Sequence, residues 1–308
     1  MVFFMTELEQ NIEGFLLYLQ FERRYSRHTI QAYQVDLQQF VDYLRISHDM
    51  QNGIDVNTVT PFLLKSWLSG LRGDKKLSVR TINRKISSIR SFFRYLLRKD
   101  LLDKDPSTSL HIFKVPKRLP SFLSEDQALE LLDAQGGEPE NWNQRTGDLV
   151  FDLLYHTGLR VSELTALQER HVDYRAAQLK VLGKGNKERI IPLSEDLLQR
   201  IQAYVDDKIK LSVVADRCHL LVNQSGRPLY PKYVYRQIRD RLGSLRQLSK
   251  KSPHVIRHTF ATHLLNSGAE LNAIKDLLGH SSLAATQVYT HNSIEKLKDI
   301  HKKTHPKG

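Results

Sequence analysis

Apolar residues recur at helical spacing throughout the first third of the chain. Between Leu8 and Gln20 they fall three or four residues apart, which predicts an amphipathic helix. The same spacing predicts a second helix from Ser26 through Leu44. It predicts a third over residues 61–71, where the opening proline suits the first turn. A fourth helix is predicted over residues 78–97, so this part of the chain is expected to be all-helical.

The fourth predicted helix separates charge from apolar surface sharply. At about 100° per residue, its isoleucine, phenylalanine and leucine residues share one arc, and Lys85 alone joins them there. The residues of the opposite arc are Arg80, Arg84, Arg90, Arg94 and Arg98. From Arg72 to Lys104 the chain has eleven lysines and arginines against three aspartates. A solvated polar face is the ordinary explanation, but a face of one sign favours a bound polyanion, so these arginines are predicted to contact DNA.

A basic, proline-rich stretch from Lys114 to Pro120 interrupts the helical pattern. Proline lacks a backbone donor and favours extended chain, which suits a linker. We therefore expect a helical domain over residues 1–111, a linker over 112–120 and a second domain over 121–308. The second domain is expected to begin with a helix that Ser124 caps.

The second domain shows mixed patterns. Short strand-like runs at residues 179–182 and 188–193 flank a glycine-rich turn, which predicts a β-hairpin. Helices are expected after Ser194, from Ser252 to Gly268, and from Ala269 until Gly279 stops the last of these. A short amphipathic helix is predicted near residues 293–303. Its apolar side chains are Ile294, Leu297 and Ile300.

Composition narrows the class of protein. The chain has 308 residues, with 40% hydrophobic and 26% charged, which is typical of a globular protein of two domains. Its single cysteine, Cys218, excludes an intrachain disulfide, and no apolar run is long enough to span a bilayer. No signal peptide is recognisable, so a cytoplasmic protein is expected. A net charge of +12 favours either nucleic acid or an anionic membrane surface as partner.

Six residues with reactive side chains follow one another in the second domain. They are Arg160, Lys184, His254, Arg257, His280 and Tyr289. Each alone has an ordinary explanation, such as a surface arginine, a turn lysine, a helix-terminal histidine or a half-buried tyrosine. His254 and Arg257 lie three residues apart and share a helix face. Lys184 follows Arg160 by 24 residues, His280 follows Arg257 by 23, and Tyr289 follows His280 by 9.

The six residues and the segments around them resemble the sequence motifs of the tyrosine recombinase (phage integrase) family, in particular its Xer type. The matching segments are Thr157-Gly158-Leu159-Arg160-Val161-Ser162-Glu163-Leu164, Gly183-Lys184-Gly185-Asn186-Lys187-Glu188-Arg189, His254-Val255-Ile256-Arg257-His258-Thr259-Phe260-Ala261-Thr262, Leu277-Leu278-Gly279-His280 and Val288-Tyr289-Thr290-His291. The segment beginning Ser26-Arg27-His28-Thr29 is similar to the Xer N-terminal signature. The resemblance covers nearly the whole chain. It implies a mainly α, C-shaped DNA clamp of two domains: a helical core-binding domain and a mostly helical catalytic domain with a small β-hairpin.

The resemblance also implies a mechanism. Tyr289 would attack the scissile phosphate and form a 3′-phosphotyrosyl link, with Arg160 and Arg257 holding the non-bridging oxygens. His254 would be the acid/base, and Lys184 would protonate the leaving 5′ oxygen. His280 would either hydrogen-bond the phosphate or help to place Tyr289. No metal or cofactor is expected, since the sequence has neither a Walker loop nor an Asp/Glu cluster for paired Mg²⁺. A zinc site at His254, His258, His263 and His280 is the alternative that the histidines leave open.

The implied partner is double-stranded DNA with a specific recombination site, bound by a tetramer on two such sites. The sequence leaves open whether the tetramer is homomeric or includes a sister Xer recombinase, and whether a DNA translocase at the division septum takes part. The terminal helix is expected to dock on a neighbouring protomer; the alternative is that it folds back onto its own domain. The implied role is chromosome dimer resolution; the alternatives are an integrase of a mobile element, a type IB topoisomerase and a catalytically silent DNA-binding regulator.

Overall fold

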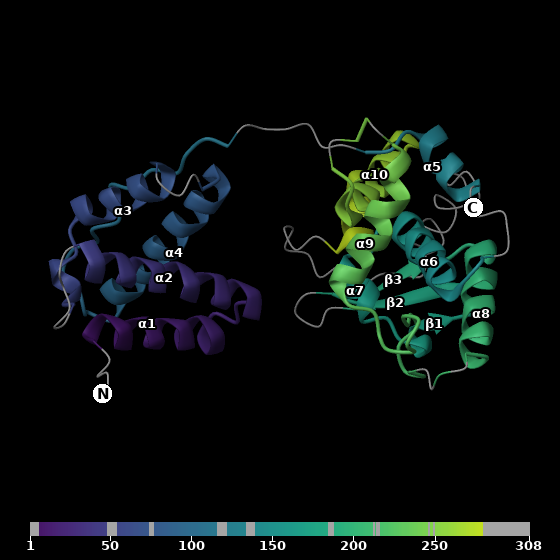
Figure 1. Cartoon of the computed structure of the whole chain (residues 1–308), viewed down its shortest axis with the longest axis horizontal. Helices are drawn as coiled ribbons and strands as arrows, with labels where there is room; N and C mark the ends of the chain where they lie inside the picture. The colour runs from purple at the N-terminus through teal and green to yellow at the C-terminus, as the bar shows by residue number, and fades with distance from the viewer. Residues whose placement is uncertain are drawn as a thin grey trace. The chain divides into compact units, whose positions relative to one another are not determined.

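The chain folds into two compact units, residues 1–118 and 119–308, in the computed structural model (Figure 1). The structure describes residues 6–47, 54–73, 77–115, 122–133, 139–183, 188–211, 213, 216–245, 247–248 and 250–279. The predicted turn lysine Lys184, the residues His280 and Tyr289, and the predicted terminal helix lie outside these ranges. Within the described residues, no helix has both the length and the apolar character needed to cross a membrane.

The first unit is helical where it is described, as its spacing predicts. Its elements are α1 (Glu7–Leu17), the π-helical turn η1 (Tyr18–Glu22), α2 (Arg27–Ser47), the 3-10 turn η2 (Val56–Thr58), α3 (Pro61–Gly73) and α4 (Val79–Arg98). Polar side chains fix three of the helix starts. Thr6 and Glu9 form a reciprocal capping box, while the Ser26 and Ser78 hydroxyls accept from the amides of Thr29 and Thr81.

The core of the first unit lies between its four long helices. The largest side chains buried there are Phe15, Phe40, Trp67, Phe92 and Phe93. The predicted first helix is wrong in one detail, because its last turn widens into a π-helix that keeps Leu19 buried and leaves Phe21 exposed.

Lys85 is buried on the apolar side of α4, as its position on the helix predicts. Its ammonium group donates to the carboxylate of Asp36 on α2 at 2.8 Å, and Asp36 is itself completely buried. The Lys85 charge also lies over the Trp67 ring, 5.7 Å from its centroid. An opposite charge and an aromatic face thus compensate a lysine that burial would otherwise disfavour.

The second unit combines helices with one small sheet. Its helices are α5 (Glu125–Asp133), α6 (Trp142–Thr157), α7 (Val161–Thr165), the 3-10 turn η3 (Glu169–His171), α8 (Glu195–Ile209), α9 (Pro231–Arg241), the 3-10 turn η4 (Leu242–Ser244), α10 (Pro253–Asn266) and α11 (Leu271–Leu278). Its strands are β1 (Val172–Asp173), β2 (Gln178–Leu182) and β3 (Glu188–Pro192). The sheet is antiparallel in the order β1-β2-β3, with Val181 opposite Arg189. The predicted hairpin strands are confirmed, whereas β1 was not predicted.

Helix α6 is the centre of the second unit. Every residue from Leu149 to Thr157 is buried, and α8, α9 and α10 all pack against the helix (Figure 1). It ends at Gly158, which has a φ of +59°. A Cβ at Gly158 would lie 2.9 Å from the Leu278 side chain and nearer still to the Phe260 ring. Only glycine therefore allows α10 and α11 to approach the end of α6, which is where Arg160 follows.

Candidate active site

Arg160 lies immediately beyond the end of α6 and forms the N-cap of α7. Its backbone amide donates to Glu163 Oε2 at 2.8 Å, and its guanidinium donates to Glu163 Oε1 at 2.7 Å. The Arg160 side chain is one-third exposed, while that of Glu163 is buried. One carboxylate therefore holds both the backbone and the side chain of Arg160, and part of the guanidinium still reaches the surface.

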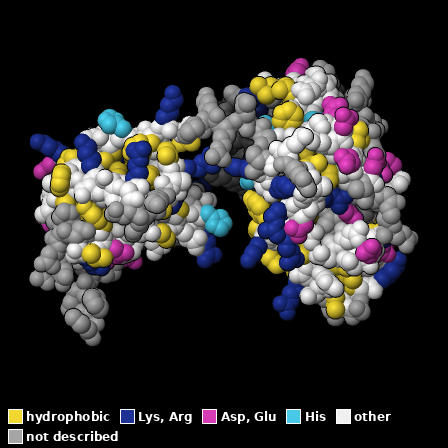
Figure 2. All heavy atoms as spheres, turned by 45° about the horizontal axis from the view of Figure 1, so that its top comes forward, with side chains coloured by type: hydrophobic (Ala, Val, Ile, Leu, Met, Phe, Trp, Pro, Cys, Tyr) yellow, Lys and Arg dark blue, Asp and Glu magenta, His cyan; other side chains and the backbone are white. Residues whose placement is uncertain are grey.

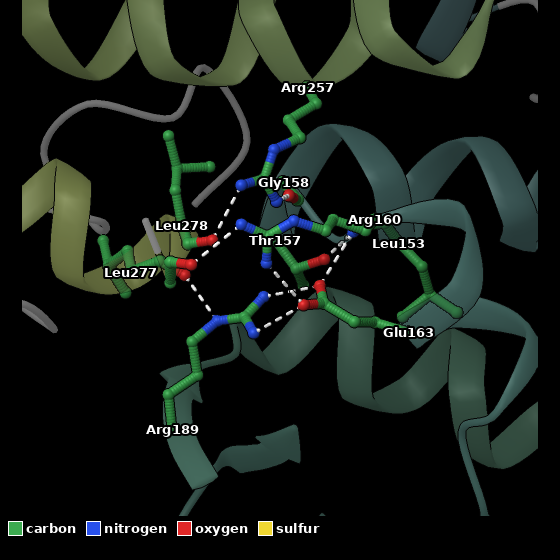
Figure 3. A network of polar contacts seen from close by, with 10 residues as sticks. Leu153, Thr157, Gly158, Arg160, Glu163, Arg189, Arg257, Leu277 and Leu278 are labelled. Atoms are coloured by element: carbon green, nitrogen blue, oxygen red, sulfur yellow. Dashed lines mark hydrogen bonds and ion pairs between the residues drawn. The ribbon is translucent and has the colours of Figure 1, made fainter. Parts of the chain in front are cut away.

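Arg257 points from α10 toward the same place (Figure 3). Its guanidinium donates to the backbone carbonyls of Gly158 and Leu278, the latter at 2.7 Å, and the residue is buried. His254 lies three residues earlier, in the first turn of α10, and is exposed. The structure thus brings Arg160 and Arg257 together at the end of α6 and keeps His254 accessible on the helix that carries Arg257.

A third arginine joins this site, and residue patterns alone did not single it out. Arg189 on β3 donates to both carboxylate oxygens of Glu163, at 3.0 and 2.8 Å, and its Nε donates to the Leu277 carbonyl at 2.7 Å (Figure 3). Arg189 and Glu163 both occur in the sequence words that match the family. Only the fold, however, places the two side chains together, 26 residues apart in the chain.

The three arginines converge on the end of α11. The carbonyls of Leu277, Leu278 and Gly279 accept hydrogen bonds from Arg189, Arg257 and Arg160 respectively. The last carbonyls of a helix have no partner within the helix and carry its negative dipole end, so cations are favoured there. The next residue in the chain is His280. The two predicted catalytic arginines are therefore bonded to the segment that leads directly into the third predicted phosphate ligand.

Among the described residues, the site has more positive charge than the Glu163 carboxylate can balance. Burial alone would raise the pKa of Glu163, but hydrogen bonds from Arg189 and from Arg160 outweigh it and lower that pKa. Burial lowers the pKa of Arg257 to about 10, and the neighbouring charge of Arg160 adds to this effect. Three guanidiniums around one ionised carboxylate favour the binding of a further anion, such as a phosphate, at this site.

One of the four histidines of the alternative zinc site, His263, has no ring nitrogen free to bind a metal. Both ring nitrogens of His263 are occupied, because Nδ1 faces the Tyr155 hydroxyl at 3.2 Å and Nε2 the Leu123 carbonyl at 2.8 Å. His263 therefore anchors the start of the second unit to α6 and α10. Within the described ranges, no three His, Cys, Asp or Glu side chains are grouped as metal ligands would be.

The arginine face of α4 divides into two groups. Arg84 donates to Asp36 at 2.5 Å, Arg90 to the Leu110 carbonyl, and Arg98 to the Tyr18 hydroxyl at 3.1 Å. Arg80 and Arg94 are exposed. Arg84 and Arg90 are half-buried and support the fold of the first unit, so the predicted DNA contact now depends mainly on Arg80 and Arg94, with the exposed Arg98 beside them.

A second basic surface, which was not predicted, lies on α9. Its exposed cationic residues are Lys232, Arg236 and Arg239. Figure 2 shows Lys and Arg side chains of the second unit gathered mainly on the side where α9 lies in Figure 1, with most Asp and Glu side chains on the opposite side. The signal was present in the sequence as the spacing of these residues three or four apart. Together with the arginine site, this surface is typical of the class of proteins that bind a phosphate-bearing polymer.

Comparisons with known proteins identify the family. Residues 121–296 match the phage integrase family, and residues 12–100 match the N-terminal SAM-like domain of phage integrases. The tyrosine recombinase XerC of Pelobacter propionicus is 38% identical over 304 residues, covering 99% of this chain and 98% of that protein. The tyrosine recombinase XerD of Halalkalibacterium halodurans is 33% identical, covering 99% of this chain and all of that protein. The chain belongs to the phage integrase family and is a DNA strand-breaking and rejoining recombinase of the tyrosine type.

Solved structures share the fold. The integrase of the Tn1549 transposon, in complex with transposon right end DNA, matches with a TM-score of 0.70 at 19% identity, covering 96% of this chain and 99% of that one. The XerH recombinase in a post-cleavage complex with a palindromic difH substrate matches with a TM-score of 0.68 at 20% identity, covering 94% and 83%. These matches agree with the mainly helical fold and small sheet that the family resemblance implies.

Proposed function

We propose that Tyr289 cleaves DNA at a specific recombination site and that Arg160 and Arg257 bind the scissile phosphate. The observation that carries this proposal is the convergence of the two guanidiniums on the carbonyls of Leu278 and Gly279, one residue before His280. Guanidinium forks fixed in this way can donate to two non-bridging oxygens without reorganising when charge develops in the transition state.

The proposed reaction exchanges one phosphate ester for another. The Tyr289 phenol oxygen bonds to phosphorus while the bond to the 5′ oxygen breaks, and the phenol proton passes to His254. Lys184 gives a proton to the departing 5′ oxygen, and His280 hydrogen-bonds the phosphate. The ester energy stays in the 3′-phosphotyrosine, so attack by a free 5′-hydroxyl rejoins the strand without ATP. No step in this scheme uses a metal ion.

We further propose that both units contact one duplex. The first unit would use Arg80, Arg94 and Arg98, and the second would use the basic surface of α9. The recombinogenic assembly would be a tetramer on two sites, with this chain alone or beside a sister Xer recombinase, and the terminal helix would link protomers. Resolution of chromosome dimers in the cytoplasm, with a septal DNA translocase, is the role that fits relatives named XerC and XerD.

A nicked suicide substrate tests the nucleophile. Tyr289→Phe removes one oxygen and retains the ring, so the variant should bind the site and form no covalent DNA complex. Tyr174→Phe is a matched control, because Tyr174 is an exposed tyrosine of the same unit and should capture DNA normally. Covalent complex at the wild-type level from Tyr289→Phe would refute the assignment. Formation of the covalent complex by the wild type would exclude a catalytically silent regulator.

A further inference from the structure

We propose that Arg189 is a positioning residue that holds Arg160 in register with the end of α11. This inference rests on the proposed phosphate-binding role of Arg160. Arg189 is buried, and its guanidinium donates three hydrogen bonds inside the protein, two to the Glu163 carboxylate and one to the Leu277 carbonyl. It cannot bind DNA in this arrangement and would act only through the groups that it holds.

The first contact of Arg189 sets the orientation of Glu163. The two terminal nitrogens of Arg189 donate to one carboxylate oxygen each, at 3.0 and 2.8 Å, which fixes the plane of the carboxylate. The same two oxygens accept from the backbone and the guanidinium of Arg160 at 2.8 and 2.7 Å. The direction in which Arg160 points therefore depends on a carboxylate that Arg189 holds from its other side (Figure 3).

The second contact ties this pair to α11. Arg189 Nε donates to the Leu277 carbonyl, and the next two carbonyls accept from Arg257 and Arg160. A shift of α11 along its axis would break the Arg189 contact and move the Arg257 and Arg160 contacts together. Arg189 thus determines the register of the helix end against which both predicted catalytic arginines are placed.

The position of Arg189 in the hairpin gives the contact a further consequence. Arg189 lies on β3, five residues after Lys184 in the chain. The start of β3, the strand that follows the turn containing the proposed general acid, is thereby bonded to the same helix end and carboxylate as Arg160. Lysine cannot replace arginine here, because a single ammonium group lacks the planar fork and the separate Nε donor.

Arg189→Lys separates positioning from charge. At saturating protein, we expect cleavage of a half-site suicide substrate to slow about 100-fold, the order of loss that a misplaced reacting group causes, while site binding stays at the wild-type level. A methylphosphonate at the scissile position removes the negative charge that Arg160 is proposed to neutralise. The defect should therefore shrink strongly on that substrate, whereas a general loss of folded protein would slow both substrates equally.

Arg241→Lys is the matched control. Arg241 also donates to a partly buried carboxylate and to a backbone carbonyl, those of Asp148 and Leu131. It lies outside the arginine site. The Arg241→Lys substitution should lower the melting temperature without changing the cleavage rate of bound DNA. Equal slowing of both substrates by Arg189→Lys, or an unchanged rate in folded protein, would overturn the proposal.

A double-mutant comparison covers the case in which Arg189→Lys folds poorly. Glu163→Gln breaks the same link from the carboxylate side, so it should show the same substrate-dependent defect. Combining the two substitutions should then slow cleavage no more than the worse single variant. Fully multiplied defects would contradict a shared pathway. Failure of this inference can be distinguished from failure of the proposed function, because Tyr289→Phe tests the proposed function with the arginine site unchanged.

Discussion

Each unit of the molecule has a buried carboxylate that two cationic side chains contact, and the two clusters differ in charge balance. In the first unit, Asp36 accepts from Lys85 and Arg84 and ties α2 to α4. In the second, Glu163 accepts from Arg160 and Arg189, and Arg257 lies nearby as a third cation. The first cluster has one cation in excess, the partly exposed Arg84. The second has two.

The surplus charge distinguishes a scaffold from a candidate site. The ammonium of Lys85 is almost fully buried, and its partners Asp36 and Gln39 belong to its own unit. In the second cluster Arg160 remains one-third exposed, and burial and neighbouring arginines depress the pKa of Arg257. A bound phosphate would relieve that repulsion. Substitutions in the first cluster should therefore reduce stability, and substitutions in the second should reduce chemistry.

The largest expected effect is on stability, at Asp36. Asp36→Asn removes the charge that compensates Lys85 inside the first unit, and breaking a buried ion pair costs about 3–5 kcal/mol. Denaturant unfolding, followed by a probe within the first unit, should show this loss. Asp42→Asn is the control, because Asp42 is an exposed residue of the same helix that pairs with Gln38. A loss no larger than that of Asp42→Asn would mean that Lys85 does not need its partner.

Arg160 should show the opposite behaviour. Arg160→Ala removes the donor that we propose stabilises the developing negative charge, and loss of such a donor typically slows chemistry about 10²–10³-fold. Arg84→Ala, its counterpart beside Asp36, should destabilise the first unit and leave the cleavage rate of bound DNA unchanged. Single-turnover cleavage at saturating protein separates the two outcomes. Equal effects of both substitutions on that rate would remove the distinction between the clusters.

The fold was predictable where one helix face alone meets the core. In α4 the apolar stripe, the Ser78 cap and even the exceptional position of Lys85 follow from the sequence. In α6 every residue from Leu149 to Thr157 is buried, so the second half of this helix has no polar face to indicate its period. Strand β1 has two residues and exists through its pairing with β2, which local propensity cannot anticipate.

The candidate site was predictable as a set of residue types and only partly as an arrangement. Arg160 and Arg257 come from the family resemblance, and the fold brings them together. The partner of Arg84 is 48 residues away in the chain, and Glu163 joins Arg189 across 26 residues. Such long-range pairs depend on the tertiary packing of helices and hairpin. Sequence alone therefore assigned Arg84 to a DNA surface when it also supports the core.

Lys184 allows a test of which chemistry the arginines of the Glu163 cluster perform, because the proposed role of Lys184 is proton transfer and not charge neutralisation. Lys184→Ala should slow cleavage of ordinary DNA by about 10²-fold or more, the typical contribution of a general acid. Sulfur at the 5′ bridging position leaves as a thiolate without a proton, so that substrate should largely escape the defect. Arg160→Ala should remain slow on the sulfur substrate. Equal slowing of Lys184→Ala on both substrates would show that another group supplies the proton.

The smallest expected effects concern the exposed arginines of α4. Arg80→Ala and Arg94→Ala should each lower the dependence of log Kd on log salt by about one unit, since each loses about one phosphate contact. Arg90→Ala is the internal comparison. Its guanidinium donates to the Leu110 carbonyl, so its loss should lower the melting temperature and leave the salt slope unchanged. Fluorescence anisotropy on a half-site duplex at several salt concentrations measures the slope directly. If Arg90→Ala changed the slope as much as Arg80→Ala, the whole arginine arc would bind phosphate, and the division of α4 into supporting and DNA-facing arginines would be wrong.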